Sequence, residues 1–179
     1  MKYIGSLAVG LTLILSNASH ASVMKPVEFS ELVSRSSWIV HGRVVKRESF
    51  WDTSKSRIYT RVTMEVTTLH KGDRRKDDSI SFVTLGGQVG RYAQRVIGEP
   101  NFEKNEEVLL FLERRGRHAM VAGMAQGKFR IERKASRVYA VRNTSCVKWH
   151  GSPPRTRYFL EELEQKIRDE KDRTKSRNP

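Results

Sequence analysis

Apolar and polar positions alternate along much of this chain, in short runs that are typical of half-buried β-strands. The run over residues 58–66 is the clearest, because it places Arg61 and Glu65 on one face and apolar side chains on the other. Gly42 predicts a bulge or bend in the first strand. Strands are also predicted over 38–45, 80–85, 120–123, 127–131 and 138–141, of which 120–123 and 127–131 form an antiparallel pair.

One run departs from this alternation. Residues 108–112 are all apolar, which fits a strand that is buried on both faces. A glycine-rich excursion over 87–104 precedes it. Residues 47–57 are polar by comparison, and they predict a loop with Phe50 and Trp51 in its middle.

Helical spacing occurs at both ends of the β-rich stretch. A short helix is predicted over 27–34, ahead of the first strand. Pro153 and Pro154 end the β region, since proline cannot donate to a strand ladder. Apolar residues then recur at helical spacing, which predicts an amphipathic helix within 152–170 that packs on the sheet. Residues 171–179 carry no large apolar side chain and are predicted to be disordered.

These elements predict a mainly β fold. We expect a small antiparallel barrel of the OB type, flanked by a short N-terminal helix and the C-terminal helix. The barrel is expected to occupy residues 22–151, as one domain.

The first 21 residues have the three-part pattern of a secretory signal peptide. Lys2 precedes an apolar run that is shorter than the about 20 residues of a membrane-spanning helix, and small residues stand at positions 19 and 21. We therefore expect an exported chain that begins near Ser22, either periplasmic or secreted. Cys146 is the single cysteine, so it is either a partly buried thiol or the partner of a cysteine in another chain.

The chain is strongly basic, with a formal net charge of +14. The signal segment holds one basic residue and no acid, and residues 155–179 hold eight basic and six acidic residues. About +11 therefore falls on residues 22–154. This favours anionic partners, although a basic surface without a specific role remains an alternative.

The order of elements resembles the netrin-like, OB-type barrels that include the N-terminal domain of tissue inhibitors of metalloproteinases. The strand over 38–44 reads Trp-Ile-Val-His-Gly-Arg-Val and carries this resemblance, together with 71–72, 80–84 and 106–111. The chain also resembles an exported bacterial family of uncharacterised proteins, through the motifs at 51–52, 58–60, 86–90, 98–102 and 124–129.

The resemblance implies a fold and an exported location, and no particular activity. Tissue inhibitors use a disulfide-tethered cysteine at the mature N-terminus to reach the catalytic zinc. Here the expected N-terminus is Ser22 and no cysteine lies near it, so that mechanism does not carry over.

Catalytic and metal-binding patterns are weak in this sequence. Among the histidines at 41, 70, 118 and 150, no two share a metal-ligand spacing. Cys146 lies four residues from His150 without an evident third group. The glycines at 86, 87 and 90 invite a phosphate-loop interpretation, but no Lys-Ser or Lys-Thr follows them, so a wide connection is favoured. We expect no enzyme, no cofactor and no metal.

Binding is the function that we expect instead. The first hypothesis is a non-catalytic module that recognises another exported protein through the excursion over 87–104 and the barrel rim. The alternative is an electrostatic binder of nucleic acid or acidic polysaccharide through basic turns, with aromatic side chains as stacking platforms. Trp51 also suits a second role, covering the barrel end. The candidate binding residues are Trp51, Arg74, Arg75, Lys76, Tyr92, Arg114, Arg115, Arg117, Lys128 and Arg130.

Overall fold

The computed structural model describes residues 23–73 and 78–177. The predicted signal peptide lies outside the described residues. So do three candidate binding residues of the predicted basic turn, Arg74, Arg75 and Lys76.

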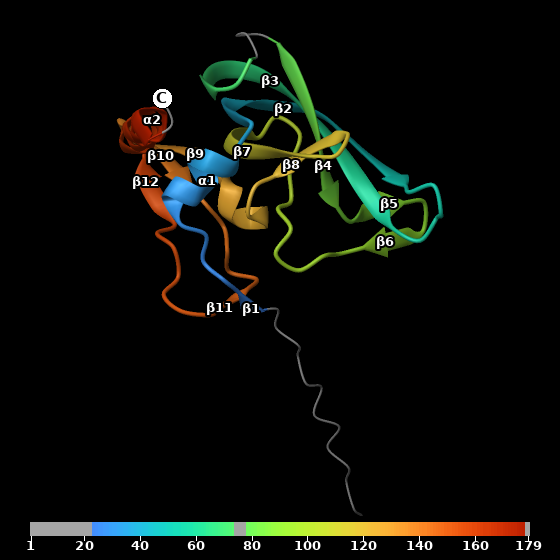
Figure 1. Cartoon of the computed structure of the whole chain (residues 1–179). Coiled ribbons are helices and arrows are strands. Elements are labelled where there is room, and N and C mark those ends of the chain that lie inside the picture. The colour runs from blue at the N-terminus through green and yellow to red at the C-terminus, as the bar shows by residue number, and fades with distance from the viewer. Residues whose placement is uncertain (1–22, 74–77, 178–179) are drawn as a thin grey trace, which may run out of the picture.

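The fold is built on one antiparallel sheet with the strand order β12, β10, β9, β7, β2, β3, β4, and β8 also pairs with β7 (Figure 1). The predicted mainly β class is therefore confirmed. The strands of this sheet are β2 (Trp38–Trp51), β3 (Ile58–Lys71), β4 (Ser79–Leu85), β7 (Glu107–Arg115), β8 (His118–Val121), β9 (Lys128–Lys134), β10 (Arg137–Val141) and β12 (Arg157–Phe159). Two small pairs complete the set: β1 (Val23–Met24) with β11 (Lys148–Trp149), and β5 (Gly87–Val89) with β6 (Tyr92–Gln94).

The sheet is strongly curled and open. Its edge strand β4 lies close to β8, but no hydrogen-bonded ladder joins these two strands within the described residues. The predicted bend at Gly42 is confirmed, because the β2–β3 register shifts between His41 and Gly42. A Cβ at Gly42 would lie 1.9 Å from the carbonyl oxygen of Glu65, so only glycine fits this close approach.

Strand β7 is buried on both faces, as its sequence predicted. Val108, Leu110 and Leu112 belong to a core inside the curl of the sheet. Leu109 and Phe111 belong to a second core on the other face, under the helices. Because successive side chains of a strand point to opposite faces, one strand supplies both cores.

The predicted pairing of 120–123 with 127–131 is wrong. Strand β8 pairs with residues 112–115 of β7, and β9 pairs with residues 108–110 of the same strand. The physical reason is the connection between β8 and β9. Gly123 is left-handed with φ of 64°, and the 3-10 helix η1 (Met124–Gly127) follows it, so the chain turns away before β9 begins.

The two helices cover one face of the sheet. α1 (Phe29–Arg35) confirms the predicted N-terminal helix, and α2 (Leu160–Arg177) is the amphipathic C-terminal helix. The predicted end of this helix at residue 170 is wrong, because α2 continues to Arg177, into the segment that was predicted to be disordered. Lys171 accounts for part of this, since its ammonium donates to the carbonyl oxygen of His70. Neither helix has the length and apolar composition to span a membrane within the described residues.

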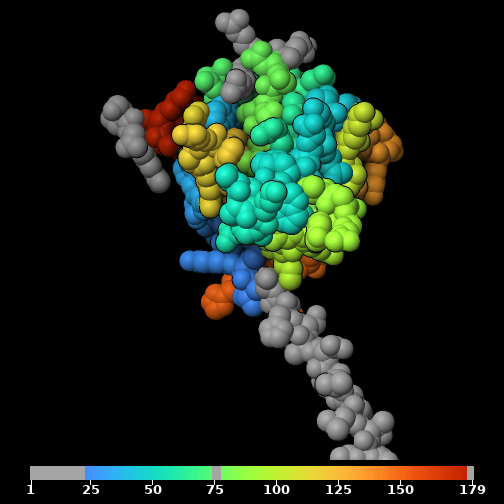
Figure 2. Space-filling model, turned by 90° about the vertical axis from the view of Figure 1, so that its right-hand side faces the viewer, coloured from blue at the N-terminus to red at the C-terminus, as the bar shows by residue number. Residues whose placement is uncertain are grey.

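Strand β2 is longer than predicted and carries Phe50 and Trp51 as strand residues. These two pair with Tyr59 and Ile58 across the β2–β3 hairpin, so the loop is confined to its tip. There the Asp52 carboxylate accepts hydrogen bonds from backbone and side-chain groups of residues 54–57, which lower its pKa to about 2. The β5–β6 segment packs beside this tip on the face seen in Figure 2.

Candidate binding pocket

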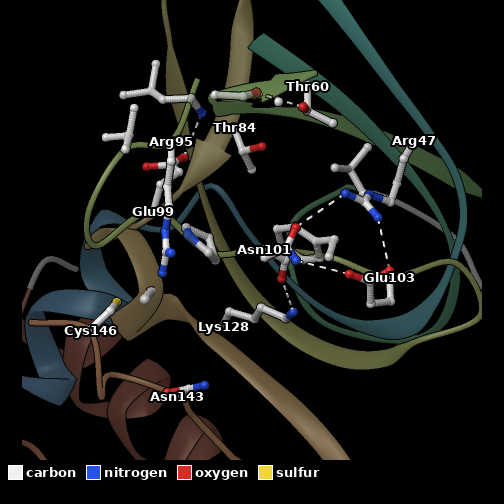
Figure 3. Close-up of a pocket in the computed structure, with 18 of the residues that line it drawn as sticks. Arg47, Thr60, Thr84, Arg95, Glu99, Asn101, Glu103, Lys128, Asn143 and Cys146 are labelled. Carbon is white, nitrogen blue, oxygen red and sulfur yellow. Dashed lines mark hydrogen bonds and ion pairs between the residues drawn. The ribbon is translucent and has the colours of Figure 1, made fainter. Parts of the chain in front are cut away.

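A pocket of about 720 Å³ opens between residues 84–106 and residues 125–146 (Figure 3). Its remaining wall comes from β2 and β3, through Arg47, Thr60 and Val62. This volume is typical of sites that hold a small molecule or a short segment of another chain. The predicted excursion over 87–104 therefore forms one side of a cavity.

Glycines fix the start of the excursion. Gly87 has φ of 140°, and a Cβ there would lie 2.3 Å from Oγ1 of Thr60 and 2.4 Å from Oγ of Ser49. The Thr60 hydroxyl donates to the carbonyl oxygen of Gly86 at 2.7 Å. Positive φ and close approach explain the glycines, as the interpretation of a wide connection required.

Polar side chains then anchor the rest of the excursion to the sheet. Gln94 Oε1 accepts the backbone N–H of Ile58 at 2.7 Å, and a Glu99 carboxylate oxygen accepts the N–H of Leu85 at 3.0 Å. These contacts tie a segment with little regular structure to two strands. The pocket wall is therefore held in place before any ligand arrives.

The pocket floor holds a nearly buried ion pair. Lys128 Nζ lies 2.8 Å from both carboxylate oxygens of Glu106, and the two side chains are only 13% and 11% exposed. The ammonium also donates to the carbonyl oxygen of Asn101 and lies 4.2 Å from the ring centre of Phe102. Burial lowers the pKa of Lys128, and the carboxylate of Glu106 opposes that shift.

A second ion pair stands at the rim. Arg47 lies 3.1 Å from a carboxylate oxygen of Glu103 and donates to Oδ1 of Asn101 at 3.3 Å. The amide of Asn101 donates in turn to Glu103 at 3.0 Å. Figure 3 shows these three side chains grouped at one end of the pocket. Two of the cations that line the pocket are therefore neutralised by acids of the pocket itself.

The opposite end carries Arg95 and Glu99 (Figure 3). Burial raises the pKa of the Glu99 carboxyl, although the hydrogen bond from Leu85 works against this. Arg95 is exposed, and no ion pair joins it to another residue in the described ranges. This guanidinium is the group at the pocket that is most available to an external anion.

Cys146 lines the same end of the pocket and is exposed, so the prediction of a partly buried thiol is wrong. No histidine contributes to the lining among the described residues. Within residues 23–73 and 78–177, no cluster of histidine, cysteine and acidic side chains could hold a metal ion.

The structure separates the predicted binding residues into several places. Lys128 and Arg130 line the pocket. Trp51 and Tyr92 meet at the hairpin tip, with ring centres 5.8 Å apart and interplanar angle 70°, and Arg91 lies 5.3 Å from the ring centre of Tyr92. Both residues were predicted separately as stacking platforms, but their contact was not predicted, because they lie far apart in sequence.

The second predicted basic turn is only partly available to a ligand. The Arg114 guanidinium lies 4.9 Å from the ring of Trp38, and Arg115 forms an ion pair with Glu113 at 2.7 Å. Arg117 lines a separate, smaller pocket near β4 and β8. Arg47, Arg95 and Asn101 were not among the predicted binding residues, because their places in the pocket lining depend on the path of the excursion.

Comparison of the chain with protein-family models, with curated proteins and with solved structures finds no match. The resemblance to netrin-like barrels and to an exported bacterial family stays a prediction.

Proposed function

We propose that this chain is an exported, non-catalytic binding module that holds a short segment of another exported protein in the pocket between residues 84–106 and 125–146. The observation that supports this most is a preformed pocket of about 720 Å³ whose wall is anchored by hydrogen bonds. A binding site that needs no rearrangement loses less entropy when the ligand enters.

The chemistry of the pocket suggests what such a segment carries. The Arg47 and Lys128 charges are neutralised internally, which leaves Arg95 to attract an acidic residue or a terminal carboxylate. Val96, which is half-buried, offers apolar surface next to it. An extended segment with an acidic residue next to an apolar one fits this lining.

The alternative function, binding an anionic polymer through the predicted basic turns, has less support. Arg114 and Arg115 already have intramolecular partners. The first basic turn lies outside the described residues.

Site-specific photo-cross-linking tests the proposal. A photoreactive phenylalanine analogue at Ser145, which lines the pocket and is exposed, leaves Arg95 intact and should give one discrete protein adduct in cell-envelope extract. The same analogue at Lys104, which is exposed and lies in the excursion but does not line the pocket, should give none. Equal adducts at both positions, or none at either, would contradict the proposal.

A synthetic peptide of the cross-linked segment provides the decisive measurement. Calorimetry with the purified chain should show binding, and Val96→Trp, which fills the pocket, should weaken the affinity about ten-fold or more. Lys104→Trp is the matched control and should leave the affinity unchanged. If both tryptophan variants bind like the parent chain, the segment is held elsewhere.

A further inference from the structure

A second surface, away from the pocket floor, combines arginines with aromatic rings. Antiparallel partners lie on the same face of a sheet, and the register pairs Tyr139 with Phe159, Val141 with Arg157, and Arg137 with Lys134. The side chains on the opposite face, such as Ala140 and Tyr158, lie in the helix-covered core. We call the outward set the arginine–aromatic face; it consists of Arg130, Glu132, Lys134, Arg137, Tyr139, Val141, Arg157 and Phe159.

The centre of this face is a stack. The rings of Tyr139 and Phe159 lie 5.1 Å apart with an interplanar angle of 29°. The Arg157 guanidinium lies 3.8 Å from the ring centre of Tyr139, and that of Arg137 lies 5.5 Å from Phe159. A guanidinium that lies over a ring keeps its charge and can still donate its N–H groups to other partners.

The two arginines of the stack are not held in ion pairs. Neither Arg137 nor Arg157 forms an ion pair with any residue in the described part of the chain. The charge of Arg157 nevertheless helps, after the hydrogen bond from Arg130, to lower the pKa of the Glu132 carboxyl. The one carboxylate on this face, Glu132, is engaged by Arg130 and lies 3.7 Å from Lys134. Four basic side chains thus face solvent against one acid.

We propose that the arginine–aromatic face binds single-stranded nucleic acid. Arg137 and Arg157 are exposed and can donate to phosphate oxygens. Phe159, which is 43% exposed, offers apolar surface on which a base can stack. Arg130 also lines the pocket, but neither contact needs the pocket, so this inference does not depend on the proposed function.

Single strands suit this face better than a duplex does. The face is a narrow strip of β9, β10 and β12, and β12 has only three residues. It presents no helix or long ribbon that could enter a major groove. Flexible strands can instead place phosphate and base on adjacent arginine and aromatic side chains.

Fluorescence anisotropy with a labelled twenty-nucleotide thymidine strand tests the inference on the chain from Ser22. We expect binding at 50 mM salt, and a loss of affinity of about ten-fold or more in Arg137→Gln/Arg157→Gln. The slope of log K against log salt should fall by about 1.4 in this variant, since each phosphate contact contributes about 0.7. Phe159→Ala should weaken binding about five-fold or more through lost stacking.

The matched control is Arg61→Gln/Arg91→Gln. These two arginines are also exposed, and each lies over an aromatic ring at the hairpin tip, Phe50 and Tyr92 respectively. This control removes the same charge and should change the affinity less than two-fold. An equal loss in both double variants would overturn the inference in favour of general electrostatic attraction. Absence of binding at 50 mM salt, or equal competition by duplex DNA or a sulfated polysaccharide, would overturn it as well.

Discussion

Two cations of the pocket and two of the arginine–aromatic face differ in whether a carboxylate neutralises the charge. In the pocket, Lys128 and Arg47 are matched by Glu106 and Glu103. On the face, Arg137 and Arg157 rest on aromatic rings. A carboxylate partner neutralises the charge of a cation. An aromatic ring instead fixes the position of a cation and leaves its charge available to a ligand. The net charge of the chain therefore does not indicate where an anion will bind.

The largest expected effect is in the pocket. Lys128→Met leaves the Glu106 carboxylate poorly solvated and without its counterion, so the free energy of unfolding should fall by about 3 kcal/mol. Urea denaturation of the parent chain and of Lys128→Met measures this change in the free energy of unfolding. The double variant Lys128→Met/Glu106→Gln should recover most of the loss, because it removes the unpaired charge. A double variant as unstable as the single one would show that the pair matters through packing.

His70, a buried histidine under α2, extends the comparison. Unlike Lys128 and the arginines, it avoids a buried charge because burial favours its neutral form. Burial, followed by the charges of His41, Lys171 and Arg168, lowers the pKa of His70 from 6.5 to about 4, and Glu164 lies 3.6 Å away.

Because its pKa is lower in the folded state, His70 contributes full stability above about pH 6.5, and this contribution is lost as the pH falls toward 4. Between pH 7 and pH 5 the chain should lose about 2 kcal/mol of unfolding free energy. His70→Gln should lose much less over this range, whereas the exposed His118→Gln should behave like the parent chain. An unchanged pH dependence in His70→Gln would refute this assignment.

Arg142 is buried like Lys128, but no carboxylate among the described residues pairs with it. It is therefore a third case, beside the ion-paired cations of the pocket and the exposed arginines of the face. It is 3% exposed and lies 4.4 Å from the ring of Phe129. Its Nε and Nη1 donate to no described residue, and burial lowers its pKa to about 10. Arg142 interacts with Tyr158 and the Phe129 ring but with no carboxylate among the described residues. Arg142→Met should therefore raise the unfolding free energy by about 1 kcal/mol, because it removes a buried charge that has no counterion. A urea denaturation midpoint for Arg142→Met that lies below that of the parent chain would contradict this prediction.

The smallest effect is expected on the arginine–aromatic face. Arg157→Gln removes an exposed charge that has no ion-pair partner within the described residues, so the unfolding free energy should change by less than about 0.5 kcal/mol. The same urea measurement compares it directly with Lys128→Met. A loss of 2 kcal/mol or more would mean that the face is structural.

Local patterns predicted much of the fold. The apolar run over 108–112 predicted a strand buried on both faces, and the alternation over 58–66 matches the burial along β3. Pairing was harder to predict, because the turn after Gly123 moves β9 onto β7. Strand β12 was missed because three residues directly before a helix carry little alternation.

The candidate sites depend even more on distant contacts. The excursion over 87–104 was expected to matter, but which side chains converge on the pocket depends on anchors such as Gln94 to Ile58. The arginine–aromatic face requires β12 to pair with β10, which places Phe159 beside Tyr139. No periodicity in either segment alone contains that information.

Strand β7 has a consequence for how the molecule melts. Since its alternate residues supply the cores on both sides of the sheet, neither core can lose its packing without exposing the strand that the other core needs. The two cores should therefore unfold as one cooperative unit, and amide protons of β7 should exchange with solvent only through global unfolding.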